Sequence, residues 1–323
     1  MHNEFLEQVK NETVLPVIVS PMFIISKPKM VIESCKSGVI GTFPLLNART
    51  EEQLIEWMEE ITGELSRLKV ENPDAKIAPW GVNLIVHSSN HRYEGDLEII
   101  KKYQPPIVIT SLGKPVKEVE IVHSYGGKVF SDVISTKHAK KAAEAGVDGL
   151  VLVCNGAGGH GGTLNPYAFV AEVRQFWDGL IILAGCLTNG RDVLSARALG
   201  ADFAYMGTRF ITTEEAAADE EYKEMIIEST TQDIIYTDAI SGVNANFLTK
   251  SIIKAGLDVS NLKKKDKVEV VHDEEAKAWK NIWSAGQGVG SITEVQPIAE
   301  VVRQLKEEHD HALAELTKVG ITS

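Results

Sequence analysis

Regular alternation of two residue patterns constrains this chain more than any other feature. Short apolar runs alternate with amphipathic runs along residues 14–210, and each apolar run is followed by a stretch of helical periodicity. The runs are apolar throughout rather than on every second residue, which predicts burial on both faces and therefore a parallel sheet. We expect strands at residues 14–23, 39–46, 78–86, 107–112, 128–134, 149–154, 180–186 and 203–210.

These eight strand–helix units predict an α/β fold of the (β/α)8 TIM-barrel type. An open doubly wound sheet would carry phosphate-binding glycines after its first strand, where this chain has Pro21 and Met22. After Thr213 the sequence becomes more polar and mostly helical in pattern. We therefore expect a barrel made of residues 1–213 and 281–323, with residues 214–280 forming a small helical domain inserted late in the chain.

Composition excludes several classes of function. Lys and Arg number 33 against 45 Asp and Glu, and a net charge of −12 argues against nucleic-acid binding. No apolar stretch is long enough to span a membrane, and the N-terminus lacks the pattern of a signal peptide. Three scattered cysteines form neither a disulfide framework nor a metal motif, so we expect a cytoplasmic protein without a metal site.

Active sites of such barrels lie at the carboxyl ends of the strands. Gly185 and Cys186 follow the seventh expected strand, and Gly207 and Thr208 end the eighth. Glycines there let backbone N–H groups approach a ligand, and a following helix adds a positive dipole. The pattern predicts a phosphate site. Asn83, Ser111 and Asp132 are further candidates because they end the third, fourth and fifth expected strands.

A glycine-rich segment after the sixth expected strand, residues 156–162, is the second candidate feature. We call it the glycine loop. It contains five glycines and one ionisable side chain, His160. Such a loop can lie flat against a planar ligand, and its histidine can donate a hydrogen bond to an anion or accept a proton near neutral pH. His87 and His91 are weaker candidates, because a metal would need a third ligand.

Several segments together resemble one known family. In chain order they are Ser20-Pro21-Met22, Gly81-Val82-Asn83, the AGGHGG run of residues 157–162, Ala184-Gly185, the MGTRF run of residues 206–210 and the SAGQGVG run of residues 284–290. This set resembles the nitronate monooxygenases, formerly called 2-nitropropane dioxygenases, over residues 14–292. The flavin-dependent enoyl-ACP reductases have a similar scaffold and a similar histidine loop.

The resemblance implies FMN on the barrel, with a small domain closing the site. In that case His160 would be the catalytic histidine, and FMN would be bound by Pro21, Met22, Asn83, Asp132, Gly158, Gly159, Gly185, Cys186, Gly207, Thr208, Gln287 and Gly288. Asp132 stands where many members carry a basic residue, so its charge is expected to oppose formation of an anionic reduced flavin.

The implied reaction is oxidation of alkyl nitronates, or of nitroalkanes, with O2 to a carbonyl compound and nitrite. One alternative is a reductase on the same barrel that passes hydride from NAD(P)H to an enoyl thioester or a quinone. A second alternative is a flavin-free barrel that binds a phosphorylated ligand. The expected partners are a small-molecule substrate and O2, without nucleic acid or membrane, and the sequence is compatible with a homodimer.

Overall fold

The computed structural model describes residues 2–263 and 281–318 and contains an eight-stranded parallel sheet. The strands follow the order β1-β9-β8-β6-β5-β4-β3-β2. Their bounds are β1 Val17–Val19, β2 Gly41–Pro44, β3 Trp80–Ile85, β4 Ile107–Ser111, β5 Lys128–Val133, β6 Gly149–Val153, β8 Leu180–Ala184 and β9 Phe203–Met206. All eight expected strands are present, and most of their residues are buried, as expected of a parallel sheet covered on both faces.

Backbone contacts between the first and last strands of this order close the sheet into a barrel. Ile18 forms an isolated parallel bridge with Ile40, the residue before β2. The N–H of Val19 donates to the carbonyl of Ile40 at 2.8 Å, and the N–H of Ile40 donates to that of Val17 at 3.0 Å. The predicted (β/α)8 barrel is therefore confirmed.

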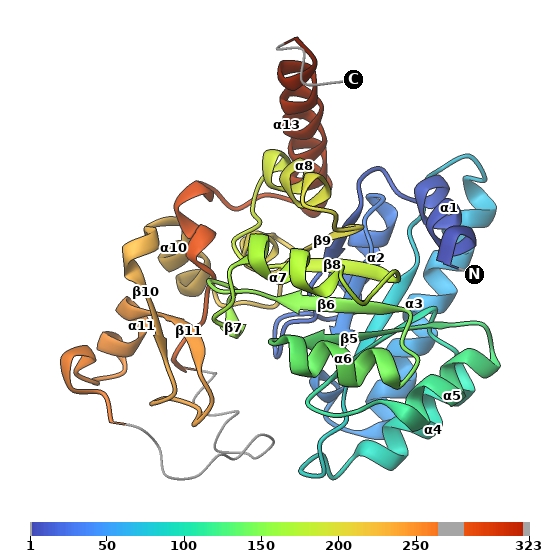
Figure 1. Cartoon of the computed structure of the whole chain (residues 1–323), viewed down its shortest axis with the longest axis horizontal. Coiled ribbons are helices and arrows are strands. Elements are labelled where there is room, and N and C mark those ends of the chain that lie inside the picture. The colour runs from blue at the N-terminus through green and yellow to red at the C-terminus, as the bar shows by residue number, and fades with distance from the viewer. Residues whose placement is uncertain (1, 264–280, 319–323) are drawn as a thin grey trace.

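Helices surround the barrel (Figure 1). They are α1 His2–Glu12, α2 Pro28–Lys36, α3 Glu51–Glu71, α4 Tyr93–Tyr103, α5 Val116–Ser124, α6 Thr136–Glu144, α7 Pro166–Val173, α8 Gly190–Ala198, α9 Thr208–Ile211 and α13 Ile298–Lys318. The eighth expected strand was too long, because it ends at Met206 and α9 begins two residues later. The first was also too long, since β1 ends at Val19.

The part of the chain between α9 and α13 is not purely helical. It contains α10 Glu220–Ile227 and α11 Thr249–Lys254, but also the strands β10 Ile234–Thr237 and β11 Ala245–Leu248. These strands pair antiparallel with each other, and β11 also pairs with β7, Gly159–His160. Figure 1 shows this small sheet on one side of the barrel. Residues 264–280 of the expected insertion lie outside the described residues.

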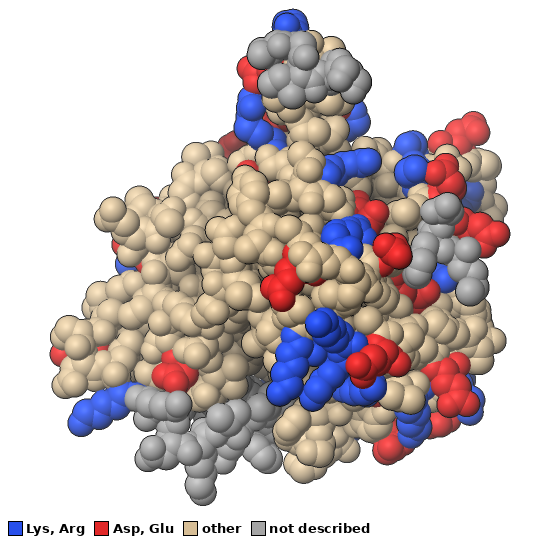
Figure 2. Space-filling model, viewed as in Figure 1, with Lys and Arg blue, Asp and Glu red and all other residues tan. Residues whose placement is uncertain are grey.

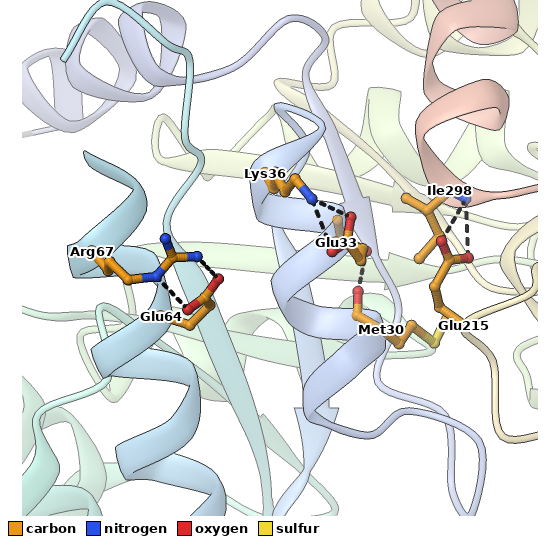
Figure 3. Close-up of polar contacts among 8 residues, drawn as sticks. Met30, Glu33, Lys36, Glu64, Arg67, Glu215 and Ile298 are labelled. Atoms are coloured by element: carbon orange, nitrogen blue, oxygen red, sulfur yellow. Dashed lines mark hydrogen bonds and ion pairs between the residues drawn. The ribbon is translucent and has the colours of Figure 1, made fainter. Parts of the chain in front are cut away.

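Side chains from distant segments cap α13 and α8, two helices that pack against each other. The Glu215 carboxylate accepts the N–H of Ile298 at 3.0 Å at the start of α13, as Figure 3 shows beside the ion pairs of α2 and α3. The Glu308 carboxylate of α13 accepts the N–H of Gly190 at 2.7 Å at the start of α8. Carboxylates at helix N-termini satisfy free N–H groups and complement the helix dipole.

Close contact between α8 and α13 requires glycine at position 190. A Cβ there would lie 2.1 Å from the Leu305 carbonyl oxygen and 2.4 Å from the His309 backbone nitrogen. Both atoms belong to a helix backbone, so neither can move without displacing α13.

We predict that Gly190→Ala lowers the free energy of unfolding by about 1–3 kcal/mol, as expected for overpacking. Urea unfolding at constant pH measures it. Gly63→Ala is the matched control, because Gly63 lies within α3 and a Cβ there meets nothing within 4 Å. That control should gain about 0.5–1 kcal/mol from helix propensity. Equal stabilisation by both variants would contradict the packing argument.

Candidate active site

One large cavity of about 1400 Å³ opens at the carboxyl ends of the barrel strands. Eleven of the twelve expected cofactor-binding residues and the expected catalytic histidine line it. Gln287 is the one expected cofactor-binding residue that does not line the cavity. Its backbone N–H donates to the carbonyl of Gly156 at 2.9 Å. The lining set includes Pro21, Met22, Asn83, Asp132, Gly158, Gly159, His160, Gly185, Cys186, Gly207, Thr208 and Gly288.

His160 is held by backbone pairing rather than by a free loop. It lies on β7, opposite Ala245 of β11. Its Nε2 lies 3.5 Å from the Ser241 hydroxyl oxygen, and that hydroxyl donates to the Val243 carbonyl at 2.9 Å. Burial lowers the pKa of His160 below its usual range. The imidazole is therefore neutral at pH 7, which lets it accept a proton.

Two more residues of the segment between α9 and α13 fix the glycine loop. The Asn246 side-chain amide donates to the Ala157 carbonyl at 2.7 Å, and the Tyr236 hydroxyl donates to the Gly161 carbonyl at 2.9 Å. Sequence reasoning missed Tyr236, Ser241 and Asn246. Their contacts join residues about 75–89 positions apart, and no local pattern predicts such pairs.

The return loop, residues 284–290, packs against the glycine loop. The N–H of Gly286 donates to the Thr208 hydroxyl at 2.9 Å. A Cβ on Gly158 would lie 2.8 Å from the nitrogen of Gly286, so glycine is needed for this approach. Trp283, just before the return loop, stacks on Tyr222 with ring centroids 5.0 Å apart. Three segments far apart in sequence thus meet at one edge of the cavity.

The loops after β8 and β9 contact the return loop, since a Cβ on Gly288 would lie 3.3 Å from the Cys186 carbonyl oxygen. Gly185 and Cys186 both have left-handed backbone conformations, with φ of +129° and +59°. The first N–H groups of α8 are already bonded by protein groups. The Asn189 side chain accepts the N–H of Asp192 at 3.0 Å, and Glu308 caps Gly190. These contacts complement the dipole of α8 within the protein, and Gly185, Cys186, Thr188, Gly207 and Thr208 line the cavity at this point.

A chain of hydrogen bonds links the ends of β3, β4 and β5. The Asn83 amide donates to the Ser111 hydroxyl at 2.7 Å, and that hydroxyl donates to Asp132 Oδ2 at 2.6 Å. Asp132 Oδ1 is buried and has no hydrogen-bond partner among the described residues. Burial raises the pKa of Asp132 to about 6. The parallel strands bring these side chains together at one edge of the barrel.

Comparison with known proteins identifies the family to which this site belongs. Residues 7–308 match the family described as nitronate monooxygenase. The chain belongs to the nitronate monooxygenase family. Its members are flavin-dependent oxidoreductases. The match covers the barrel, the glycine loop and the return loop.

Individual relatives and solved structures agree with this family. The nitronate monooxygenase of Neurospora crassa is 28% identical, with 95% of this chain and 91% of that protein covered. A probable nitronate monooxygenase of Staphylococcus aureus is 26% identical over 74% of this chain and 76% of its own. The fold is shared with a nitroalkane oxidase from Streptomyces ansochromogenes and with FabK from Thermotoga maritima. Their TM-scores are 0.80 and 0.77, their identities 20% and 21%, and the coverage of both chains is at least 95%.

Tyr205 is another residue of this family member that sequence reasoning missed. It lies on β9 and lines the cavity. Burial and the nearby Asp132 raise the pKa of its phenol well above the usual range, so the hydroxyl stays protonated. In the sequence, Tyr205 is marked only by a hydroxyl group within an apolar strand. That feature does not distinguish a site residue from a core residue.

The remaining candidates do not form a second site. Burial raises the pKa of the Cys154 thiol to about 12, which fits a core residue rather than a nucleophile. His87 Nδ1 lies 2.8 Å from the Ser89 hydroxyl oxygen, whereas His91 lines the cavity. Within residues 2–263 and 281–318, no group of His, Cys, Asp and Glu side chains could hold a metal ion. No helix in these ranges is both long and apolar enough to cross a membrane.

We predict that Asp132→Asn stabilises the protein in a pH-dependent way. The folded-state pKa of Asp132, about 6, is above the usual value. Ionisation therefore costs the folded state stability, beginning near the unfolded pKa and complete above pH 6. The variant should gain roughly 1–3 kcal/mol at pH 7 and little near pH 4. Urea unfolding at both pH values measures this difference, and a gain that is the same at both would contradict it.

Proposed function

We propose that this chain oxidises alkyl nitronates, with FMN and O2, to a carbonyl compound and nitrite. Membership of the nitronate monooxygenase family supports the reaction class. The single observation that carries the proposal is the half-buried His160 on β7, whose pKa is lowered by desolvation and which lines a cavity large enough for a flavin and a small substrate. Nitroalkanes are substrates in this proposal only if His160 can remove their carbon-bound proton.

The residues of the cavity fit an FMN cofactor. Gly207 lines the cavity without a side chain, next to Met22 and Ser20, so a phosphate could approach its backbone directly. The Thr208 hydroxyl already accepts the N–H of Gly286 and keeps its own proton to donate. Pro21 and Met22 offer an apolar wall for the ring system. The flavin supplies an acceptor for the electrons of the substrate.

His160 would either remove a proton or hold the substrate anion. Because burial lowers its pKa, the ring is in its uncharged form at pH 7, the form that can accept a proton. The Ser241 hydroxyl uses its single proton on the Val243 carbonyl, so its oxygen is available to accept from Nε2 of His160. This contact would orient the ring. Gly158 and Gly159 would keep side chains away from the planar cofactor beside it.

The remaining expectations are part of the same proposal. We assign residues 1–213 and 281–323 to the FMN-binding barrel and residues 214–280 to the insertion. Pro21, Asn83, Asp132, Gly185, Cys186, Gln287 and Gly288 complete the proposed FMN site. The three free thiols fit a reducing compartment, which supports a cytoplasmic location. The homodimer stays a prediction.

We predict that Gly207→Leu abolishes FMN binding, because a bulky side chain would fill the space proposed for the phosphate. Gly207→Ala is the control, since its Cβ would make only ordinary contacts of 3.5–3.6 Å. Flavin absorbance per mole of purified protein measures occupancy, and circular dichroism checks folding. A Leu variant that is folded and fully occupied would show that the phosphate lies elsewhere.

We predict that His160→Asn retains FMN and loses about 10²–10⁴-fold in turnover. If His160 acts as a base, the loss of turnover should be greater with neutral nitroalkane than with preformed nitronate. If His160 only holds the anion, the loss should be equal for the two substrates. kcat/KM for both forms between pH 5 and 8 gives the comparison. Ser241→Ala is the companion variant and should show a smaller loss. Wild-type values in His160→Asn would remove this histidine from the mechanism.

Anaerobic mixing tests the proposed function itself. Propane-2-nitronate should bleach the flavin absorbance band at about 450 nm, and NADPH should not bleach it. Bleaching by NADPH alone would favour the reductase alternative, and a protein without that band after purification would favour the flavin-free alternative.

A further inference from the structure

The carboxyl of Asp132, near the end of β5, has little to stabilise its negative charge. One hydrogen bond reaches it, from the Ser111 hydroxyl to Oδ2 at 2.6 Å. Oδ1 is buried and has no donor among the described residues. Within the same part of the chain, the carboxyl forms no ion pair with Lys, Arg or His. A buried carboxylate oxygen without a donor is costly, so this group is poised to take up a proton.

The direction of the hydrogen bonds fixes where that proton can bind. Both hydrogens of the Asn83 amide are used, one on the Ser111 hydroxyl oxygen at 2.7 Å and one on the Ile109 carbonyl at 3.2 Å. The Ser111 hydroxyl thus accepts from Asn83 and gives its only proton to Oδ2 of Asp132. Oδ1 is therefore the oxygen left to carry a proton.

The titratable groups around this carboxyl come from β7, β9 and α6. On β9, Tyr205 lies close enough for the charge of Asp132 to raise the pKa of its phenol. His160 of β7 lines the same cavity, as do His138 and Lys141 of α6, the helix that follows β5. The other acidic and basic side chains that line the cavity are Arg49, His91, Arg92, Lys114 and Asp219.

The cations of α6 do not neutralise Asp132. Figure 2 shows Lys and Arg side chains gathered on the outer surface over α6. His138 and Lys141 are exposed, so water and salt screen their charge. On β6, the residue paired with Asp132 is the apolar Val151. Burial therefore dominates, and it raises the pKa of Asp132 to about 6.

Such a carboxyl responds strongly to a second negative charge. A like charge nearby raises the pKa of an acid further. A flavin bound in this cavity would bring that charge when it accepts two electrons and one proton, because the ring then becomes an anion. At pH 7 a carboxyl with a pKa of about 6 is mostly ionised. A further rise of about 1–2 units would protonate half of it or more.

We propose that Asp132 takes up a proton when the bound flavin is reduced and releases it when the flavin is reoxidised, an inference that rests on the proposed flavin site but not on nitronate as the substrate. Two electrons and one proton pass to the ring, and a second proton from the medium binds Oδ1 of Asp132. The cavity then gains no net negative charge. A fixed charge at Asp132 would instead oppose reduction equally at every pH.

The pH dependence of the flavin's midpoint potential tests this proposal. The potential of the purified flavoprotein is measured anaerobically between pH 5 and 8, with dithionite as reductant and redox dyes as mediators. The wild-type potential should nearly match that of Asp132→Asn at pH 5 and fall progressively below it above pH 6. By pH 8 the difference should correspond to about tenfold or more in the proton affinity of Asp132, which equals about 30 mV for two electrons.

Asp219→Asn is the matched control, because Asp219 lines the same cavity but is exposed at the N-cap of α10, where Asn serves as well as Asp. It should shift the potential little, and equally at every pH. Ser111→Ala removes the hydrogen bond that lowers the pKa of Asp132, so the divergence from Asp132→Asn should begin at a higher pH. His160→Asn should keep the wild-type dependence on pH.

Infrared difference spectra of reduced minus oxidised protein detect the proton directly. At pH 7 the C=O stretch of a protonated carboxyl should appear on reduction in the wild type and be missing in Asp132→Asn. A difference in potential that is absent or constant across pH, or a pH dependence lost in His160→Asn instead, would overturn the proposal. Neither nitronate nor O2 is present, so a protein that passes this test but is not reduced by propane-2-nitronate would contradict only the proposed function.

Discussion

The pairing of β7 with β11 is the interaction on which the candidate site depends. β7 has only two residues, Gly159 and His160, and its partners Asn246 and Ala245 come from a segment more than 80 positions later. A glycine-rich segment has high conformational entropy when it is unpaired. The backbone bonds to β11 remove that freedom and fix the histidine in one place.

The same pairing couples the site to folding of the segment between the last barrel strand and α13. Asn246 and Tyr236 bond carbonyls of the glycine loop, while the N–H of Leu248 donates to the Trp283 carbonyl at 2.9 Å. Trp283 in turn stacks on Tyr222 of α10. The barrel supplies the proposed phosphate site, and this segment supplies the histidine position. Neither part alone would contain a complete site.

The barrel could be predicted from the sequence because its signal is local. Each strand is a short apolar run between amphipathic helices. Because parallel strands align their ends, the sequence places Asn83, Ser111 and Asp132 at one end of the barrel, where the structure links them by hydrogen bonds. The small sheet could not be predicted in this way. Ile234–Thr237 consists of residue types enriched in strands, but it is only four residues long and lies in a segment of mostly helical pattern. The two residues of β7 include a glycine, which is depleted in strands. Only long-range pairing makes them strands.

Net charge, which is summed over the whole chain, does not predict the electrostatics of the cavity. A net charge of −12 describes the whole surface and argues against a polyanion such as nucleic acid. It does not describe the cavity mouth, where Arg49, Lys114 and Lys141 line one rim. Inside, Asp132 is buried with an unpaired oxygen, and its raised pKa reflects the cost of keeping that charge out of water. An anionic substrate is therefore attracted toward the rim, whereas its negative charge would be unfavourable next to Asp132 once that carboxyl is ionised.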